Sequence, residues 1–375
     1  MAFLLRLLMV LSMATTKALS SSSSSAALSS TLPTTISKGS PRFRSFAEFI
    51  IRKQEEILAA VEVEDGSGQR FARDPWTKDG GSFGLTTCIE DGALVEKGAA
   101  SVSIIYGELT EDRAKAMSGR RNMPYQEGQG YSAAALSLVF HSKSPMVPTF
   151  RADVRYFEVD GCGEGEAPGW FGGGADLTPY YLFDEDCRDF HGCYKALCDV
   201  HEAPGGAPED GSEGGHGHLY ADLKVRCDEY FMLPARGERR GVGGIFFDDL
   251  TSLGVEGVAT DGVKGGEEGL ANAQAFTEAV ADAWMGSWLP ICRKRRGTPF
   301  TEAQRDWQLM RRGRYLEFNL LYDRGVRFGL VPGGRTEAVM VSAPPLIRWK
   351  FNHVPEAGSE EERLVGILRD PVEWA

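Results

Sequence analysis

The amino-terminal part of the sequence lacks acidic side chains. No Asp or Glu precedes Glu48, whereas five basic residues occur in the same stretch. An apolar run at residues 3–14, interrupted by Arg6, is followed by a polyserine run at residues 20–25. A short apolar run before an acid-poor, serine-rich stretch is typical of a bipartite targeting sequence. We predict that residues 1–45 are a disordered targeting segment for a plastid. A mitochondrial or cytoplasmic location, and a low-complexity tail with no address, are the alternatives.

Several other features are absent. No uncharged apolar run reaches about 18 residues, so no transmembrane segment is predicted. None of the seven cysteines forms a CxxC pair, and their odd number argues against a disulfide framework. His216 and His218 lie close together in a glycine-rich stretch but lack further ligands at a suitable spacing. The sequence therefore predicts no metal site, and it predicts an exposed loop at residues 204–217.

The whole sequence has the composition of a globular protein, with 42% hydrophobic and 25% charged residues. Its formal net charge of −12 argues against a nucleic-acid partner. Helical spacing of apolar residues predicts helices at 46–61, 184–200 and 273–289, the last ending near Pro290. Strands are predicted at 101–106, 139–150, 154–159, 241–247, 314–322 and 338–341. Strands clustered early and late and separated by helices predict an α+β fold.

A glycine-rich segment at residues 170–179 contains one acidic side chain. It reads WFGGGADLTP, with three adjacent glycines before Asp176. Such glycines let main-chain N–H groups approach a ligand, and Asp176 at the exit of the loop can accept hydrogen bonds from N–H donors. The alternative is a strand-to-helix turn in which Asp176 only caps the helix. The segment lacks a Walker lysine and a GxGxxG pattern, so no nucleotide site is predicted.

Two later segments are rich in arginine. Residues 236–249 read RGERRGVGGIFFDD, and residues 311–327 read RRGRYLEFNLLYDRGVR. Guanidinium groups bind carboxylates or phosphates through two parallel hydrogen bonds. The alternatives are a structural salt-bridge network in the first segment and a solvent-exposed strand end in the second. Because no nucleophile or cofactor motif is present, the segments together predict a site for a large polyanion that also carries N–H groups.

Four strings carry a specific resemblance. FGGGADLTPYYL, RGERRGVGGIFFDDL, RRGRYLEFNLLYDRG and FGLVPGGRTE stand in the order and spacing of the oxygen-dependent coproporphyrinogen-III oxidase family. The resemblance predicts one oxidase-like domain at residues 46–375. It implies an α+β fold with a large antiparallel sheet flanked by helices on both faces, and a homodimer that makes contact through residues 315–350. The implied reaction is the aerobic oxidative decarboxylation of two propionates of coproporphyrinogen III to vinyl groups, which gives protoporphyrinogen IX. O₂ is the co-substrate, and no cofactor is implied.

The resemblance also implies the roles of individual residues. The implied catalytic residues are Asp176, Asp323 and Arg324. The implied substrate-binding residues are Ser137, His141, Asp153, Arg155, Arg236, Arg240, Gly333, Gly334 and Arg335. Coproporphyrinogen carries four propionates, for which a ring of arginines supplies charge-assisted anchors. Its pyrrole N–H groups are donors to a central carboxylate.

The chain departs from the family pattern at several positions. Family histidines are replaced by Met146, Arg151, Asp189 and Ala235, and a family asparagine is replaced by Asp153. Arginine does not titrate near neutral pH, so Arg151 cannot donate a proton as histidine does. Two alternatives to an active oxidase follow. One is a paralogue that binds a tetrapyrrole with reduced or lost catalysis. The other is an oxidase with altered porphyrinogen specificity, because the charge of Asp153 disfavours a nearby substrate carboxylate.

Overall fold

The computed structural model describes residue 32 and residues 35–121, 124–161, 169–201, 218–254, 257–259, 266–330 and 335–375. Most of the predicted targeting segment and the predicted loop at residues 204–217 lie outside these ranges. Helix α2 (Pro41–Asp65) begins before the predicted domain boundary, because Ser40 caps it and Pro41 occupies its first turn. Within the described ranges, no helix has both the length and the apolar composition needed to cross a membrane.

One antiparallel sheet organises residues 31–375, in the strand order β1-β2-β3-β4-β5-β6-β9. Its strands are β1 (Ala72–Lys78), β2 (Ser82–Glu90), β3 (Val95–Glu108), β4 (Gly130–Ser142), β5 (Thr149–Val159), β6 (Gly169–Thr178) and β9 (Gly243–Leu250). Two small ribbons pair β7 (Met232–Leu233) with β8 (Glu238–Arg239) and β10 (Ser252–Gly254) with β11 (Gly257–Ala259). The predicted α+β fold with a large antiparallel sheet is confirmed.

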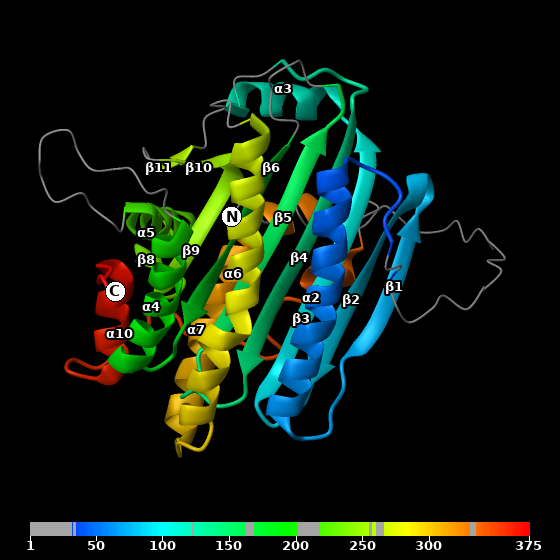
Figure 1. The fold of residues 1–375 in the computed structure, drawn as a ribbon. Coiled ribbons are helices and arrows are strands. Elements are labelled where there is room, and N and C mark those ends of the chain that lie inside the picture. The colour runs from blue at the N-terminus through cyan, green and yellow to red at the C-terminus, as the bar shows by residue number, and fades with distance from the viewer. Residues whose placement is uncertain are drawn as a thin grey trace, which may run out of the picture. The chain divides into compact units, whose positions relative to one another are not determined.

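Long helices cover one face of this sheet (Figure 1). Helix α2 packs on β3 and β4, and α6 (Gly266–Arg295) packs on β5 and β6. Helices α4 (Asp184–His201) and α5 (His218–Tyr230) pack beside α6 and β9. The core lies between these layers, where the Trp288 ring stacks on Phe140 and Phe150 with centroids 5.2 and 5.8 Å apart.

Other helices lie on the second face. They are α3 (Glu111–Arg121), α7 (Glu302–Leu321), α8 (Arg324–Gly329) and α9 (Thr336–Met340), and α10 (Glu360–Arg369) packs against β8. Residues of α3, α7, α8 and α9 line a hollow together with side chains of β3, β4 and β5. The sheet is therefore flanked by helices on both faces, as the resemblance implied.

Side chains of β5 point alternately to the two faces of the sheet, which separates its apolar residues from its charged ones. Phe150, Ala152 and Val154 are fully buried in the core, while Arg151, Asp153 and Arg155 alternate with them and line the hollow. Shifting the register by one residue would bury the charges and expose the apolar side chains. The apolar side chains therefore determine which face carries the charged groups.

The glycine-rich segment is a strand, and the predicted ligand-binding loop is wrong. Residues 169–178 form β6, between β5 and β9, and every residue of it is buried. Its main chain pairs with both neighbouring strands, so its N–H groups belong to a sheet ladder. A Cβ on Gly174 would stand 2.2 Å from the carbonyl oxygen of Ile245. The glycines therefore permit close strand pairing.

Two predicted strands are helices. Residues 314–322 belong almost entirely to α7, which begins with a capping box formed by Thr301 and Gln304. Alternation in LEFNL resembled a strand, but the buried side chains recur at helical spacing, at positions 311, 312, 315, 318 and 319. Residues 338–341 fall mostly in α9 rather than in a strand.

Two boundaries also differ. Helix α6 continues to Arg295 through Pro290, and the predicted strand at residues 139–150 is divided between β4 and β5.

Candidate active site

A cavity of about 940 Å³ lies between the second face of the sheet and the helices α3, α7, α8 and α9. This volume is near the upper end of the roughly 300–1,000 Å³ typical of small-molecule sites. Its arginines are Arg113, Arg120, Arg151, Arg155, Arg324 and Arg335, and its carboxylates are Asp153, Asp248 and Asp323. Apolar and aromatic side chains from β3, β4 and α5 complete the wall. The cavity thus combines size, apolar surface and guanidinium groups.

Arg155 crosses the sheet surface from β5 towards β9. Its guanidinium group forms ion pairs with Asp153 and with Asp248, the latter at 3.1 Å. Burial alone lowers the pKa of Arg155, but the carboxylates of Asp248 and Asp153 raise it overall. The side chain passes over Gly172, where a Cβ would stand 2.7 Å from Nε. The first glycine of the FGGG string of β6 therefore provides the space that Arg155 occupies.

Arg151 and Asp153 form a second charged pair on the same face of β5. Their Nη1 and Oδ1 atoms are 2.6 Å apart, and the Arg151 guanidinium lies 5.4 Å from the ring centroid of Phe231. Burial lowers the pKa of Arg151, whereas Asp153 and Asp323 raise it, with a net rise. Arg151 is therefore a permanent cation in the cavity.

Asp323 and Arg324 enter the cavity from the start of α8. Asp323 is the N-cap of this helix, and its Oδ1 accepts a hydrogen bond of 2.9 Å from the N–H of Val326. Arg324 is about half exposed, and its guanidinium lies 3.5 Å from Asp248 and 5.1 Å from the ring centroid of Tyr230. Both residues are placed by a helix N-terminus rather than by the predicted strand.

Asp248 connects three arginines and was not predicted as a site residue. Arg155 lies 3.1 Å from it, Arg324 3.5 Å and Arg120 3.9 Å. Burial raises the pKa of Asp248, but these guanidinium groups lower it overall. The sequence signal was available, because strand alternation in IFFDD places Asp248 on the face opposite the buried Phe247.

Asp176 and Arg240 form a buried ion pair beneath the cavity. One guanidinium nitrogen of Arg240 donates to both carboxylate oxygens of Asp176 at 2.8 Å, and another donates to Asn319 at 3.3 Å. The same guanidinium stacks on Phe231 and Tyr315, with centroid distances of 4.1 and 4.4 Å. Neither charged group belongs to the cavity lining. Arg240 thus forms a structural salt bridge, which was the alternative to ligand binding for this segment.

The other predicted substrate-binding residues separate into groups. Ser137 and Arg335 line the cavity, and Arg335 also forms an ion pair with Asp74. His141 is buried behind it, with Nε2 2.9 Å from the carbonyl oxygen of Ser342. Burial and then Arg312 hold the pKa of His141 well below its usual range.

Two further predictions concern residues outside the cavity. Arg236 lies away from it and binds Glu317 at 2.7 and 2.9 Å. Gly333 and Gly334 lie outside the described residues.

The four residues that replace family histidines lie in different parts of the fold. Of the four positions, only Arg151 lines the cavity. Met146 is buried in the hydrophobic core, while Asp189 on α4 and Ala235 before β8 are exposed. No group of three or more His, Cys, Asp or Glu residues able to hold a metal occurs in the part of the chain that the structure describes.

An antiparallel sheet with an arginine-lined cavity of this size is suited to a large organic molecule that carries several negative charges. Residues 45–374 match the coproporphyrinogen III oxidase family, and the chain belongs to that family. It is similar to a protein of Glycine max named "Oxygen-dependent coproporphyrinogen-III oxidase, chloroplastic". The two are 40% identical over 337 residues, which cover 88% of this chain and 78% of the soybean protein.

Proposed function

We propose that this protein is an oxygen-dependent coproporphyrinogen-III oxidase, an oxidoreductase of haem and chlorophyll biosynthesis. One observation carries the proposal. A single cavity brings together Arg151 and Arg155 of β5, Arg324 of α8 and Arg335 beside α9, with Asp323 among them. Four propionates need several guanidinium groups around one hollow, and the pyrrole N–H groups need a carboxylate within it.

The proposed reaction uses the electron density of the substrate itself. Deprotonation of a pyrrole N–H allows O₂ to add to the ring. The resulting peroxide removes a β-hydrogen from the propionate, and CO₂ leaves. For each side chain, –CH₂CH₂COO⁻, O₂ and a proton give –CH=CH₂, CO₂ and H₂O₂. The electron pair of the broken C–C bond forms the vinyl group, and O₂ receives two electrons. This sequence of steps requires no organic cofactor.

The residues around the cavity take separate roles in this proposal. Asp323 accepts hydrogen bonds from the pyrrole N–H groups, because its carboxylate lines the cavity. The guanidinium groups of Arg155, Arg324 and Arg335 bind propionates. Asp176 faces Arg151 across the β5–β6 pair and forms the buried pair with Arg240, so it positions those arginines rather than the substrate.

An aerobic assay with coproporphyrinogen III tests the proposal. Vinyl product and O₂ uptake are followed together, and both are expected to stop when O₂ is removed. Tight binding of coproporphyrinogen III with no product in air would reject the oxidase activity. That result would support the second candidate, a tetrapyrrole-binding paralogue without catalysis.

One observation favours this second candidate. Arg151 occupies the cavity where other family members have histidine, and its raised pKa keeps it protonated. A reaction that needs proton donation at this position would fail. The oxidase proposal therefore requires the proton to come from another group or from water.

The third candidate, altered specificity, rests on the charge of Asp153. Both Arg151 and Arg155 form ion pairs with this carboxylate. Since its charge is balanced, repulsion of a substrate propionate is weak, and coproporphyrinogen III remains the proposed substrate. Comparing turnover of porphyrinogens with fewer propionates under the same conditions tests this choice.

The proposal extends to location and assembly. The matched soybean protein is named chloroplastic, and this chain begins with an acid-poor, serine-rich segment, which supports import into a plastid. A fluorescent protein fused after the first 45 residues should enter plastids. A homodimer is supported by exposed apolar side chains within and beside residues 315–350, namely Leu320, Leu321, Leu330, Leu346, Trp349 and Phe351.

A further inference from the structure

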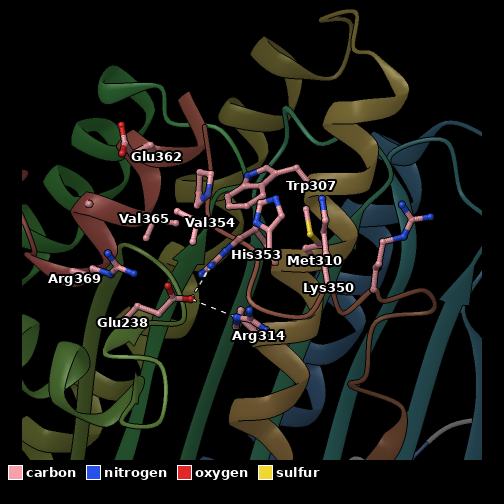
Figure 2. A pocket seen from close by; sticks show the side chains of 14 residues that line it. Glu238, Trp307, Met310, Arg314, Lys350, His353, Val354, Glu362, Val365 and Arg369 are labelled. Carbon is pink, nitrogen blue, oxygen red and sulfur yellow. Dashed lines mark hydrogen bonds and ion pairs between the residues drawn. The ribbon is translucent and has the colours of Figure 1, made fainter. Parts of the chain in front are cut away.

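A second pocket, of about 320 Å³, lies beside α7 next to Trp307, Met310, Arg311 and Arg314. Trp307, Met310 and Lys350 line one side of it and Val365 and Arg369 the other (Figure 2). It shares no lining residue with the cavity described above. The two sites use different side chains of α7, since Arg311 and Arg314 line the pocket whereas Tyr315 and Asn319, further along the helix, line the cavity.

Positive charge predominates in this pocket. Its cationic side chains are Arg311, Arg314, Arg348, Lys350 and Arg369, and its carboxylates are Glu238 and Glu362. The whole chain carries a formal net charge of −12, so the excess of cations in this pocket is opposite in sign to the net charge of the protein. Such a concentration attracts anions.

Arg311, which lines the pocket, has one donor without a partner among the described residues. This side chain is 4% exposed, and its Nη1 donates to Glu238 at 2.7 Å. Its Nη2 is buried and has no hydrogen-bond partner within the described residues. A buried N–H group without an acceptor costs free energy, so an anion close to this guanidinium group would stabilise it.

Glu238 lies beside two arginines, one of which, Arg314, also donates a hydrogen bond of 2.9 Å to Glu317. Glu238 binds Arg311 at 2.7 Å and lies 3.7 Å from Arg314, as the dashed lines from Glu238 indicate (Figure 2). Burial lowers the pKa of Arg314, and the neighbouring Arg236 and Arg311 lower it further, although Glu317 and Glu238 oppose this. An anion bound in the pocket would add a further favourable interaction with both guanidinium groups.

The remaining wall is apolar. The indole of Trp307, the Met310 side chain and Val365 face the pocket, together with Val354 and Pro355. Inorganic anions alone would leave this surface without a contact. A ligand with one anionic group and a small apolar body would match both parts of the wall.

We propose that this pocket binds a small organic anion, whose phosphate or carboxylate group contacts Arg311, Arg314 and Lys350 and whose apolar part lies against Trp307 and Val365. The site is separate from the tetrapyrrole cavity and goes beyond the proposed oxidase function. The phosphate and carboxylate forms share the same recognition chemistry, and titrations with each distinguish them.

Isothermal titration of the full chain with phenyl phosphate, benzoate and inorganic phosphate tests the proposal. The organic anions are expected to bind more tightly than inorganic phosphate. Lys350→Gln and Arg311→Met should each weaken the organic anion by about tenfold, the loss expected for one charge-assisted contact. Lys350 is exposed, so its substitution should not prevent folding even if Arg311→Met does.

Two control variants locate the binding. Lys143→Gln removes the same charge from an exposed lysine outside the pocket, and Arg335→Gln removes a cation from the large cavity. Neither should change the affinity for phenyl phosphate. The proposal is overturned if neither organic anion binds at about 10 mM, a concentration at which even weak millimolar sites fill. It is also overturned if Lys350→Gln binds as the wild type does, or if Arg335→Gln alone weakens binding.

Discussion

Gly172 leaves room for the guanidinium group of Arg155 on the cavity face of the sheet. A Cβ added at this position would lie 2.7–2.8 Å from the Nε, Cζ and Nη2 atoms of Arg155. These atoms form the far end of a flexible side chain, so the side chain rather than the backbone would move. A single methyl group would thus displace a substrate anchor with little effect on the sheet.

Gly172→Ala is therefore expected to separate activity from stability. Turnover of coproporphyrinogen III should fall by about tenfold to a hundredfold, because displacing an anchoring group by about 1 Å has effects of that size. The free energy of unfolding should change by less than about 1 kcal/mol. Steady-state kinetics and urea unfolding measure the two quantities.

Gly286→Ala is the matched control for this variant. Gly286 lies on α6, and a Cβ there would meet no atom within 4 Å. Its activity should equal that of the wild type. Wild-type activity in Gly172→Ala as well would mean that the position of Arg155 does not matter to the reaction.

His191 on α4 is a buried residue with a predictable response to pH. Its Nδ1 lies 2.8 Å from the hydroxyl oxygen of Tyr220, and burial lowers its pKa from 6.5 to about 3. Below pH 6.5 the unfolded chain protonates this imidazole while the folded chain does not, so acid favours unfolding. This contribution to stability is complete above pH 6.5 and is lost as the pH falls towards 3.

For His191, the free energy of unfolding should fall by about 2 kcal/mol between its ordinary pKa of 6.5 and about pH 5. His191→Gln should flatten the curve over this interval, whatever its stability at neutral pH. Urea unfolding at a series of pH values gives both curves. Parallel curves for the two proteins would show that His191 titrates normally in the fold.

Asp323 has two roles at the start of helix α8. Asp323 caps this six-residue helix, and its carboxylate also lines the cavity. Removing the side chain therefore changes two properties together. Asparagine caps helices about as well as aspartate but carries no charge, so it distinguishes the two roles.

Asp323→Asn should keep the stability of the wild type and lose turnover, because the accepting carboxylate is gone. Asp323→Ala should lose turnover and also about 1 kcal/mol of stability, the usual contribution of an N-cap side chain. Thermal unfolding and the aerobic assay measure these effects. An active Asp323→Asn variant would exclude a role for the charge in the reaction.

Helix α7 shows how one element serves two sites. Its buried face carries Tyr315 and Asn319 into the cavity, and Arg311 and Arg314 line the second pocket. The pattern LEFNL is compatible with either period over so few residues. The capping box at Thr301 and Gln304 was the sequence signal that favoured a helix.

At the scale of the whole molecule, an exposed apolar surface follows residues 346–354. Phe351 is 92% exposed, and Leu346 and Trp349 are each more than half exposed. Soluble monomers rarely expose such contiguous groups. This surface accounts for the homodimer that we propose, whose contact extends beyond Lys350 to Phe351.

Phe351→Glu should convert the dimer to a monomer, because a carboxylate in an apolar contact is left without water or a partner. Sedimentation or light scattering measures the mass. Val63→Glu is the matched control, since Val63 is 81% exposed on α2, outside this surface. A wild-type protein that is monomeric, or a Phe351→Glu variant that stays dimeric, would contradict the proposed contact.

The sequence by itself determined the family and the α+β class, and it pointed to five charged residues that line the cavity, namely Asp153, Arg155, Asp323, Arg324 and Arg335. Period-two alternation at residues 154–159 and helical spacing at residues 184–200 were strong local signals, and the structure has β5 and α4 there. Long shared strings identified the family without any knowledge of geometry. Patterns of this kind involve residues that are close together in the sequence, so they can be recognised from the sequence alone.

Only the tertiary structure decided which charges face the cavity. Arg236 and Arg240 both lie in the RGERRG string, yet Arg236 binds Glu317 away from the cavity and Arg240 binds Asp176 beneath it. Asp248, which the sequence offered only as a possible salt-bridge partner, lies at the centre of three arginines. An ion pair depends on which distant strands and helices meet, and that arrangement follows from packing of the whole core rather than from the residues beside each charge.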